Sequence, residues 1–331
     1  MSDRPRLIQS LRLAVAAGAV ASLGAATAPA VAAPAPATVP SATATTGPTE
    51  CKDPIAFGYY RQWRDVETTK EEDRAPNVQR MDEIPPQLDI VSAFATKPAQ
   101  DPDFWVALRD TYVPALHAQG TEVVFTIFID DIADADVELN EAAYDAHARW
   151  LVEEYVDRAG LDGLDIDTER SLDPEQTERA AGIIRALGKY LGPQSGTGRY
   201  LIYDTNMTGN HPLFPQIAEY VDYVLLQAYG RDPGRLQGTW ETFAPYISSC
   251  QFLPGFSFYE ERGWHWLDTT VPFGESRAAA YANWQPEGGG KGGIFSYALD
   301  RDGKLDGDDT ISASKYTWMK RLSGIIDEVA R

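Results

Sequence analysis

Apolar residues recur along this chain in short runs separated by longer amphipathic stretches. Eight runs have the length and the Val, Ile, Tyr and Phe content of β-strands. They are residues 55–60, 88–95, 122–129, 161–168, 200–206, 221–229, 251–258 and 292–299. Most are apolar at nearly every position, which is the pattern of strands buried on both faces of a parallel sheet.

Between these runs, apolar residues return at the spacing of an α-helix. The helical stretches are residues 101–120, 138–160, 173–192 and 312–330. The first has Asp101 at the N-cap position, Pro102 as its first helical residue and Gly120 at its end. In the third, Asp173 and Gln176 are spaced for a capping box. The connections after the fifth, sixth and seventh strands are shorter or more irregular.

Eight strand–helix units in a row predict an α/β fold of the (β/α)8 TIM-barrel type, with some helices short or replaced by loops. An open, doubly wound sheet is the alternative. Such a sheet commonly has a glycine-rich phosphate loop after its first strand. Residues 57–63, FGYYRQW, place aromatic side chains and an arginine there instead, so the barrel is favoured.

The N-terminus has the pattern of a secretory signal peptide. Three arginines precede an Ala-rich apolar stretch that ends in small residues, which predicts a signal peptide at residues 1–33. A membrane anchor is the alternative, but Pro29 interrupts the run. Residues 34–50 form a Pro/Ala/Thr-rich linker, and residues 51–331 form one folded domain. We therefore expect a secreted, extracellular protein.

The charge of the chain limits its partners. The net charge is −20 and the sequence pI is about 4.5. Such an acidic protein repels phosphate backbones and anionic lipids, so we expect neither nucleic acid nor a membrane surface as a partner. Acidity does not argue against a neutral substrate such as a sugar.

The chain has two cysteines, Cys51 and Cys250. Each lies just before a predicted strand, so parallel strands would place both thiols at the same end of the sheet. A secreted protein permits a disulfide, and we predict one between them. No Cys/His group has metal-ligand spacing and the four histidines are scattered, so we expect no structural metal. The segment 300–309, DRDGKLDGDD, only loosely resembles a calcium loop, and we interpret it as a solvated turn.

The fourth predicted strand lies within LDGLDIDTER, residues 161–170, and combines buried apolar positions with a row of acids. Side chains alternate across a strand, so Asp165, Asp167 and Glu169 share one face, roughly 7 Å apart. In a barrel this face points inward and rises to the mouth at the C-terminal ends of the strands. Glu169 is then the uppermost acid.

Three inward carboxyl groups are costly through desolvation and mutual repulsion. Repulsion raises at least one pKa and lets neighbours share protons. A carboxylic acid that keeps its proton near neutral pH can act as a general acid, and paired carboxyl groups at a barrel mouth indicate glycoside hydrolysis. The alternative is a solvated acidic loop, or carboxylates held by Arg or Lys.

The motif DGLDIDTE, residues 162–169, resembles the DGxDxDxE signature of glycoside hydrolase family 18. This family contains chitinases and endo-β-N-acetylglucosaminidases. The segment LLQAYGR, residues 225–231, resembles the Gln-x-Tyr pattern of the endoglycosidase branch, the Endo F and Endo H type. Chitinases more often have Met-x-Tyr-Asp at that place. The resemblance extends over residues 51–331.

This resemblance implies a retaining, substrate-assisted mechanism in which the 2-acetamido oxygen attacks its own sugar and forms an oxazolinium ion. Glu169 would protonate the leaving oxygen and then deprotonate water. Asp167 would orient the acetamido group, and Asp165 would hold Asp167 by a hydrogen bond. Tyr229 would bind the acetamido oxygen, with Gln227 in reach of the same group. No cofactor is implied.

Sugar-binding side chains are expected where strands end at the mouth, because apolar sugar faces stack on aromatic rings. For each aromatic residue, ordinary packing is the alternative. The candidates are Tyr59, Trp63, Phe94, Asp130, Asp131, Asp204, Asn206, Trp264, Trp266 and Tyr297.

Together these observations predict a secreted, monomeric endo-β-N-acetylglucosaminidase. Its substrates would be the N-linked glycans of glycoproteins, cut at the β-1,4 bond between the two core GlcNAc residues. Two alternatives stay open: a chitinase that acts on chito-oligosaccharides, and a glycan-binding barrel without activity.

Overall fold

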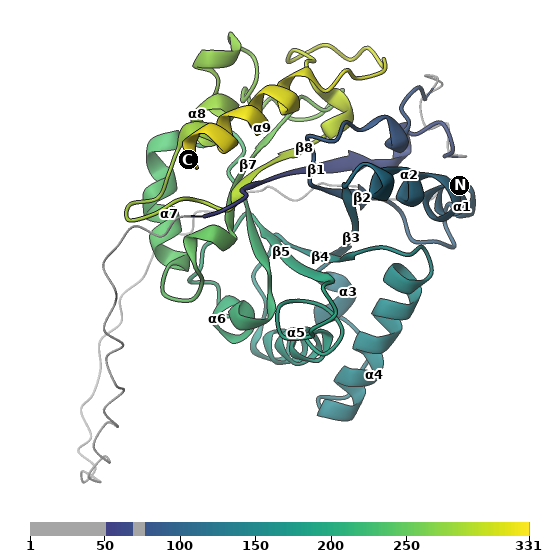
Figure 1. Ribbon diagram of the computed structural model, residues 1–331. Helices are drawn as coiled ribbons and strands as arrows, with labels where there is room; N and C mark the ends of the chain where they lie inside the picture. The colour runs from purple at the N-terminus through teal and green to yellow at the C-terminus, as the bar shows by residue number, and fades with distance from the viewer. Residues whose placement is uncertain (1–50, 69–76, 331) are drawn as a thin grey trace, which may run out of the picture. The chain divides into compact units, whose positions relative to one another are not determined.

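Eight parallel strands close into a barrel in the order of the sequence, with helices around the outside (Figure 1). The computed structural model describes residues 51–68 and 77–330. The strands are β1 Ile55–Arg61, β2 Ile90–Phe94, β3 Glu122–Phe128, β4 Gly163–Thr168, β5 Tyr200–Thr205, β6 Tyr223–Gln227, β7 Phe252–Ser257 and β8 Gly293–Tyr297. Because β8 pairs with β1, the sheet has no free edge. The predicted TIM barrel is confirmed and the open sheet is wrong. The predicted signal peptide and linker lie outside the described residues.

The interior of the barrel is filled by side chains. The inward-facing hydrophobic cluster consists of Phe57, Tyr59, Ile90, Val124, Ile202, Leu225, Leu253 and Phe295. Gly255 on β7 leaves room for Phe295, since an added Cβ would lie 2.1 Å from a carbon of that ring. A barrel packed in this way has no channel through it, so its chemistry is placed at the mouth.

The helices differ widely in length, as predicted. They are α1 Pro102–Ala107, α2 Val113–Ala118, α3 Asp130–Ala133, α4 Glu141–Leu151, α5 Pro174–Leu187, α6 Phe214–Ile217, α7 Leu236–Phe243, α8 Arg277–Asn283 and α9 Thr317–Val329. The predicted capping box is present at the start of α5, where Asp173 and Gln176 each accept the other's backbone N–H. In the described part of the chain, no helix is long and apolar enough to cross a membrane.

The predicted helices have different bounds in the structure. The stretch 138–160 begins at Glu141 and continues after Leu151 as a π-helical segment, Val152–Asp157, and the stretch 173–192 ends at Leu187. The stretch 101–120 is divided into α1 and α2 by a π-helical turn, Leu108–Tyr112. Pro114 follows that turn and has no N–H for a regular helical bond, which accounts for the irregularity. The last helix begins at Thr317 and not at residue 312, because Tyr316 has a left-handed backbone with φ of 53°.

The aspartate-rich segment 300–309 is not the solvated turn that we expected. Asp302 is buried and accepts the backbone N–H groups of Trp318 and Met319 at 2.9 and 2.8 Å, so it caps the start of α9. Asp309 accepts the hydroxyl of Tyr259 at 2.9 Å. These carboxylates hold the segment against the barrel because their oxygens accept hydrogen bonds from α9 and from Tyr259. Over residues 51–68 and 77–330, no three His, Cys, Asp or Glu side chains are grouped so as to hold a metal ion.

Three aspartates at the opposite end of the barrel join neighbouring strands. Asp89, Asp162 and Asp222 precede β2, β4 and β6. Each accepts the N–H of the second residue of the preceding strand, at 2.7, 2.7 and 2.9 Å respectively. Asp162, the first acid of the DGLDIDTE motif, is therefore a structural residue far from the mouth.

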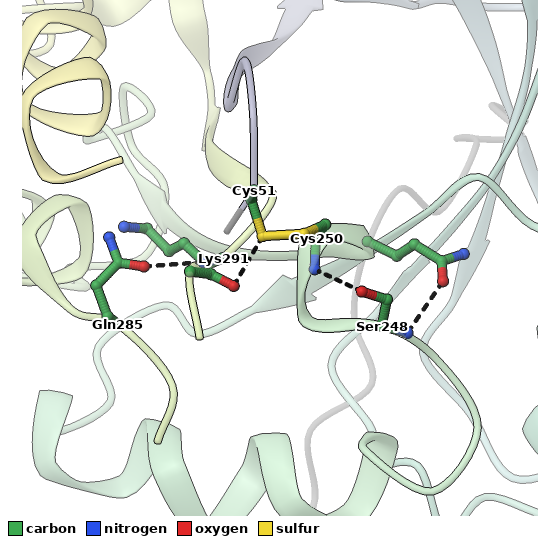
Figure 2. Close-up of a disulfide and its surroundings, with 7 residues drawn as sticks. Cys51, Ser248, Cys250, Gln285 and Lys291 are labelled. Atoms are coloured by element: carbon green, nitrogen blue, oxygen red, sulfur yellow. Dashed lines mark hydrogen bonds between the residues drawn. A yellow bond between two sulfur atoms is a disulfide. The ribbon is translucent and has the colours of Figure 1, made fainter. Parts of the chain in front are cut away.

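The two cysteines form a disulfide between the residues before β1 and the residues before β7, as Figure 2 shows. Their Cα atoms are 5.2 Å apart and 199 positions apart in the sequence. Lys291 lies next to this bridge, and its Nζ donates to the carbonyls of Ala282 and Trp284 at 2.6 and 2.8 Å. The N-terminal end of the barrel is thus closed by a covalent link and by a buried lysine.

Candidate active site

The acids of β4 rise from the interior of the barrel to its mouth. Asp165 is fully buried, Asp167 is 7% exposed, and Glu169, just beyond the end of the strand, is exposed. This gradient follows from the alternation of side chains along the strand. The three residues therefore lie on the face and in the order that the sequence predicts.

Asp165 is held by hydroxyl groups from two other strands. Its Oδ2 accepts the Tyr59 hydroxyl at 2.8 Å and the Thr126 hydroxyl at 2.9 Å. Ser92 extends this chain, with its Oγ 2.5 Å from that of Thr126. Burial raises the pKa of Asp165 to about 7, although the two hydroxyl bonds act in the opposite direction.

The expected hydrogen bond between Asp165 and Asp167 is absent within the described residues. Asp165 uses Oδ2 for Tyr59 and Thr126, while its Oδ1 has no partner. Side chains two positions apart on a strand are separated by roughly 7 Å at their Cα atoms, which is too far for carboxyl groups that point elsewhere. The coupling between the two acids is electrostatic: Asp165 contributes to the raised pKa of Asp167.

Asp167 belongs to a second buried group, together with Asp204 and Gln227. The register of β4 and β5 places Asp167 beside Asp204. The amide nitrogen of Gln227 donates to both, at 3.2 Å to Asp167 and 2.7 Å to Asp204. Burial is the largest cause that raises the pKa of each aspartate well above its usual value, and neighbouring carboxylates raise it further. Such a group retains protons, because two adjacent buried charges repel each other.

Glu169 is free to meet a ligand, while the residue after it is anchored. No hydrogen bond or ion pair holds the Glu169 side chain within the described part of the chain. Arg170 donates to Asp130 at 2.5 Å and to Asp134 at 2.8 Å. The loop that carries Glu169 is therefore fixed to α3. Asp130 uses one oxygen in this ion pair, and its contact with a sugar stays a prediction.

Aromatic rings form one continuous arc at the mouth. Tyr229 lies 5.8 Å from Trp266 and 6.2 Å from Tyr297, measured between ring centroids. Trp266 in turn lies 6.2 Å from Trp264, which is 69% exposed. The predicted aromatic residues of the turn after β6, of β8 and of the loop after β7 are thus brought together.

The arc continues across β8 to β2 and β3. Phe94 contacts Tyr297, Trp63 and Phe128 at centroid distances of 5.9, 5.9 and 5.8 Å. Phe128 was not among the predicted residues, although it ends β3 and is half exposed. Its position at the end of a strand was the available signal. Tyr59 lies deeper and is buried, so its role is to hold Asp165.

Other predicted residues take different places. Asp204 is 2% exposed and accepts a hydrogen bond from Gln227, so it lies within the buried group with Asp167 and not at the surface. Asn206 follows β5, and its backbone carbonyl accepts from Arg231 at 2.6 Å. Asp131 forms an ion pair with Lys97. A contact of the Asn206 or Asp131 side chain with a sugar stays a prediction.

The sequence did not reveal a buried ion cluster behind Tyr297. Arg61 at the end of β1 is fully buried and donates to Asp300, Glu260 and Glu261, at 2.6–2.9 Å. The hydroxyl of Tyr297 lies 3.5 Å from Glu260. This cluster ties the loop that carries Trp264 to the ends of β1 and β8. The arginine in FGYYRQW was the only local signal for it.

A closed (β/α)8 barrel with a row of carboxyl groups and an aromatic arc at its mouth defines a glycoside hydrolase type of site. Residues 58–296 match the family model of the endo-β-N-acetylglucosaminidase EndoS TIM-barrel domain. The chain is 39% identical over 279 residues to endo-β-N-acetylglucosaminidase F2 of Elizabethkingia meningoseptica, covering 82% of both chains.

Solved structures of endo-β-N-acetylglucosaminidases are also similar to this chain. An endo-β-N-acetylglucosaminidase from Cordyceps militaris superposes with a TM-score of 0.78 at 46% identity, over 82% of this chain and 90% of that one. A fungal enzyme of glycosyl hydrolase family 18 superposes at a TM-score of 0.53 and 13% identity, over 83% of this chain and 98% of that one, which shows a shared fold. The chain therefore belongs to the endo-β-N-acetylglucosaminidase family and is a glycoside hydrolase.

Proposed function

We propose that this enzyme hydrolyses the β-1,4 bond between the two core GlcNAc residues of N-linked glycans and leaves one GlcNAc on the asparagine. The names of its relatives support this activity. The observation that carries the proposal is the row of Asp165, Asp167 and Glu169, which leads from the interior to the mouth. Tyr229 lies near these acids, because burial and then Asp204, Asp167 and Glu169 raise the pKa of its phenol. A catalytic acid, a charge-stabilising carboxyl group and an acetamido-binding phenol are thereby available together at the mouth.

The proposed mechanism is retaining and uses the substrate's own acetamido group. The acetamido oxygen forms a bond to the anomeric carbon while the glycosidic bond breaks, and Glu169 gives its proton to the leaving oxygen. The N–H of the acetamido group donates to Asp167, whose negative charge stabilises the oxazolinium ion. Water then forms a bond to the anomeric carbon while the bond from that carbon to the acetamido oxygen breaks, which restores the acetamido group, and the water gives a proton to Glu169. Each of the two attacks inverts the configuration of the anomeric carbon, so the configuration is retained overall.

The surroundings of Asp167 support this division of roles. In the resting site its pKa is raised by burial and by neighbouring carboxylates. A positive charge that develops beside it favours its ionised form, so the site stabilises the transition state more than the ground state. Asp165 and Asp204, whose own pKa values are raised, hold the protons of this group while Asp167 is ionised, and Gln227 orients Asp167.

The leaving side of the substrate is proposed by analogy with a relative. A solved structure of the Cordyceps militaris enzyme, 45% identical to this chain, contains fucosyl-N-acetylglucosamine-Asn. That variant carries one Asp→Asn and one Glu→Gln substitution two positions apart, the spacing of Asp167 and Glu169. We propose that this enzyme also accepts a fucosylated core.

Secretion is a further part of the proposal. The basic and Ala-rich start of the chain supports a signal peptide at residues 1–33, and a disulfide is typical of oxidising compartments. N-terminal sequencing of protein recovered from the culture medium tests this. A mature N-terminus near residue 34 is expected, and intact residues 1–33 on all of the protein would contradict it.

A chitinase is the second candidate, because the aromatic arc offers several rings on which a GlcNAc polymer could stack. Mass spectrometry separates the two functions. The full chain is incubated with an N-glycosylated peptide and, separately, with a GlcNAc pentamer. We expect the glycopeptide to lose its glycan down to one GlcNAc while the pentamer persists. Cleavage of the pentamer alone would favour the chitinase.

A further inference from the structure

Tyr229 sits in a tight turn that follows β6. The N–H of Arg231 donates to the carbonyl of Ala228 at 2.9 Å, which closes a four-residue turn with Tyr229 and Gly230 in the middle. Gly230 has a φ of +67°, the sign that a type II turn requires at its third position. The orientation of the Tyr229 side chain therefore depends on how this turn is held.

The carboxylate of Asp268 holds the central peptide of the turn. Asp268 is fully buried and accepts the N–H of Gly230 at 3.0 Å and the N–H of Ser257, at the end of β7, also at 3.0 Å. Turns of types I and II differ by a flip of that central peptide. Because the carboxylate binds the Gly230 N–H, it stabilises one orientation of the peptide and opposes the flip.

The hydroxyl of Tyr281 on α8 holds both ends of the same turn. It lies 2.7 Å from the carbonyl oxygens of Ala228 and Arg231, and it can donate its proton to either. Tyr281 is fully buried. On the far side, Trp266 closes the space, since a Cβ added to Gly230 would lie 3.1 Å from its ring. The turn is thus enclosed by α8 and by the loop before it.

We propose that Asp268 and Tyr281 are positioning residues that act through Tyr229: they set the place of its phenol relative to the acetamido group of the substrate. The inference rests on the role given to Tyr229 in the proposed function. Neither residue contacts the substrate, so their effect falls on the chemical step. A displacement of about 1 Å in such a group can lower a rate by up to roughly 100-fold.

The test is a double-mutant cycle on the full chain with an N-glycosylated peptide as substrate. Tyr281→Phe removes one hydroxyl and keeps the ring. We expect it to lower kcat roughly tenfold with KM changed by less than about twofold. In the Tyr229→Phe background the same substitution should change kcat by less than about twofold, since the group through which it acts is gone. Tyr144→Phe is the matched control, because this buried tyrosine has a hydroxyl without a hydrogen-bond partner.

Asp268→Asn gives a second measurement of the same proposal. It keeps one acceptor oxygen but places an NH2 group opposite one of the two backbone donors, so a larger loss of kcat is expected. Thermal unfolding of each variant separates loss of kcat from loss of folded protein, and kcat is taken per folded molecule.

The proposal would be overturned if Tyr281→Phe lowered kcat by the same factor in the parent and in the Tyr229→Phe background. It would also be overturned if Tyr281→Phe left kcat of the parent unchanged. An unchanged kcat for Tyr229→Phe alone would instead overturn the role of Tyr229 in the proposed mechanism. Glycan release by that variant would still leave the proposed hydrolysis in place, so the two failures are distinguishable.

Discussion

The carboxyl group of Asp165 makes the stability of the protein depend on pH. Burial raises its pKa to about 7 from a value of 3.8. The folded state therefore binds this proton more tightly than the unfolded state, and stability falls as pH rises from about 4 to about 7. Over the whole of this pH range, such an increase in pKa changes the free energy of unfolding by roughly 4 kcal/mol at most.

Asp165→Asn removes this titration while it keeps an oxygen for Tyr59 and Thr126. Its amide nitrogen takes the place of Oδ1, which has no partner in the structure, at a cost of about 1–3 kcal/mol. We expect the variant to be less stable than the parent at pH 5. Between pH 5 and pH 8 it should gain roughly 2–3 kcal/mol relative to the parent, because the parent must then bury a charge and about two pH units separate pH 5 from the pKa of Asp165.

Urea unfolding followed by tryptophan fluorescence at pH 5, 6, 7 and 8 measures this difference. Asp103→Asn, on the exposed face of α1, is the control for the Asp→Asn substitution itself. The reasoning fails if the difference between Asp165→Asn and the parent stays constant across these pH values.

Three further predictions concern stability and substrate binding. Replacing Cys51 and Cys250 by Ala opens a loop of 199 positions and should lower the free energy of unfolding by about 2–5 kcal/mol with KM unchanged; an unaltered urea midpoint would contradict this. Arg61→Met leaves buried carboxylates without their cation and should cost about 3–5 kcal/mol, seen as a lower melting temperature. Trp264→Ala should change stability by less than about 0.5 kcal/mol because the side chain is exposed, yet raise KM for a glycopeptide. A lower melting temperature with an unchanged KM would instead show that the Trp264 side chain serves packing.

Local patterns were sufficient for the barrel and for the row of acids. Eight apolar runs predict eight strands because a sheet covered on both faces demands apolar residues at nearly every position. The order of Asp165, Asp167 and Glu169 follows from alternation along one strand. The capping box of α5 was also predictable, because Asp173 and Gln176 are only three positions apart.

Contacts between distant segments were not predictable from such patterns. Arg61 and Asp300 are 239 positions apart, and nothing near Arg61 identifies its partner. The hydroxyl groups on Asp165 come from β1 and β3, and their pairing with it depends on the register of the closed sheet. Asp204 resembled a residue at the mouth because it lies near the end of a strand, but the same register places it beside Asp167.

The central claim is that Glu169 supplies the proton for glycan release. Mass spectrometry of an N-glycosylated peptide incubated with the full chain, with Glu169→Gln and with Glu328→Gln tests it most directly. Glu328 lies on the exposed face of α9 and serves as the matched control. We expect the parent and Glu328→Gln to leave a single GlcNAc on the peptide, and Glu169→Gln to leave the glycan intact. Release at the parent's rate by Glu169→Gln would contradict the account.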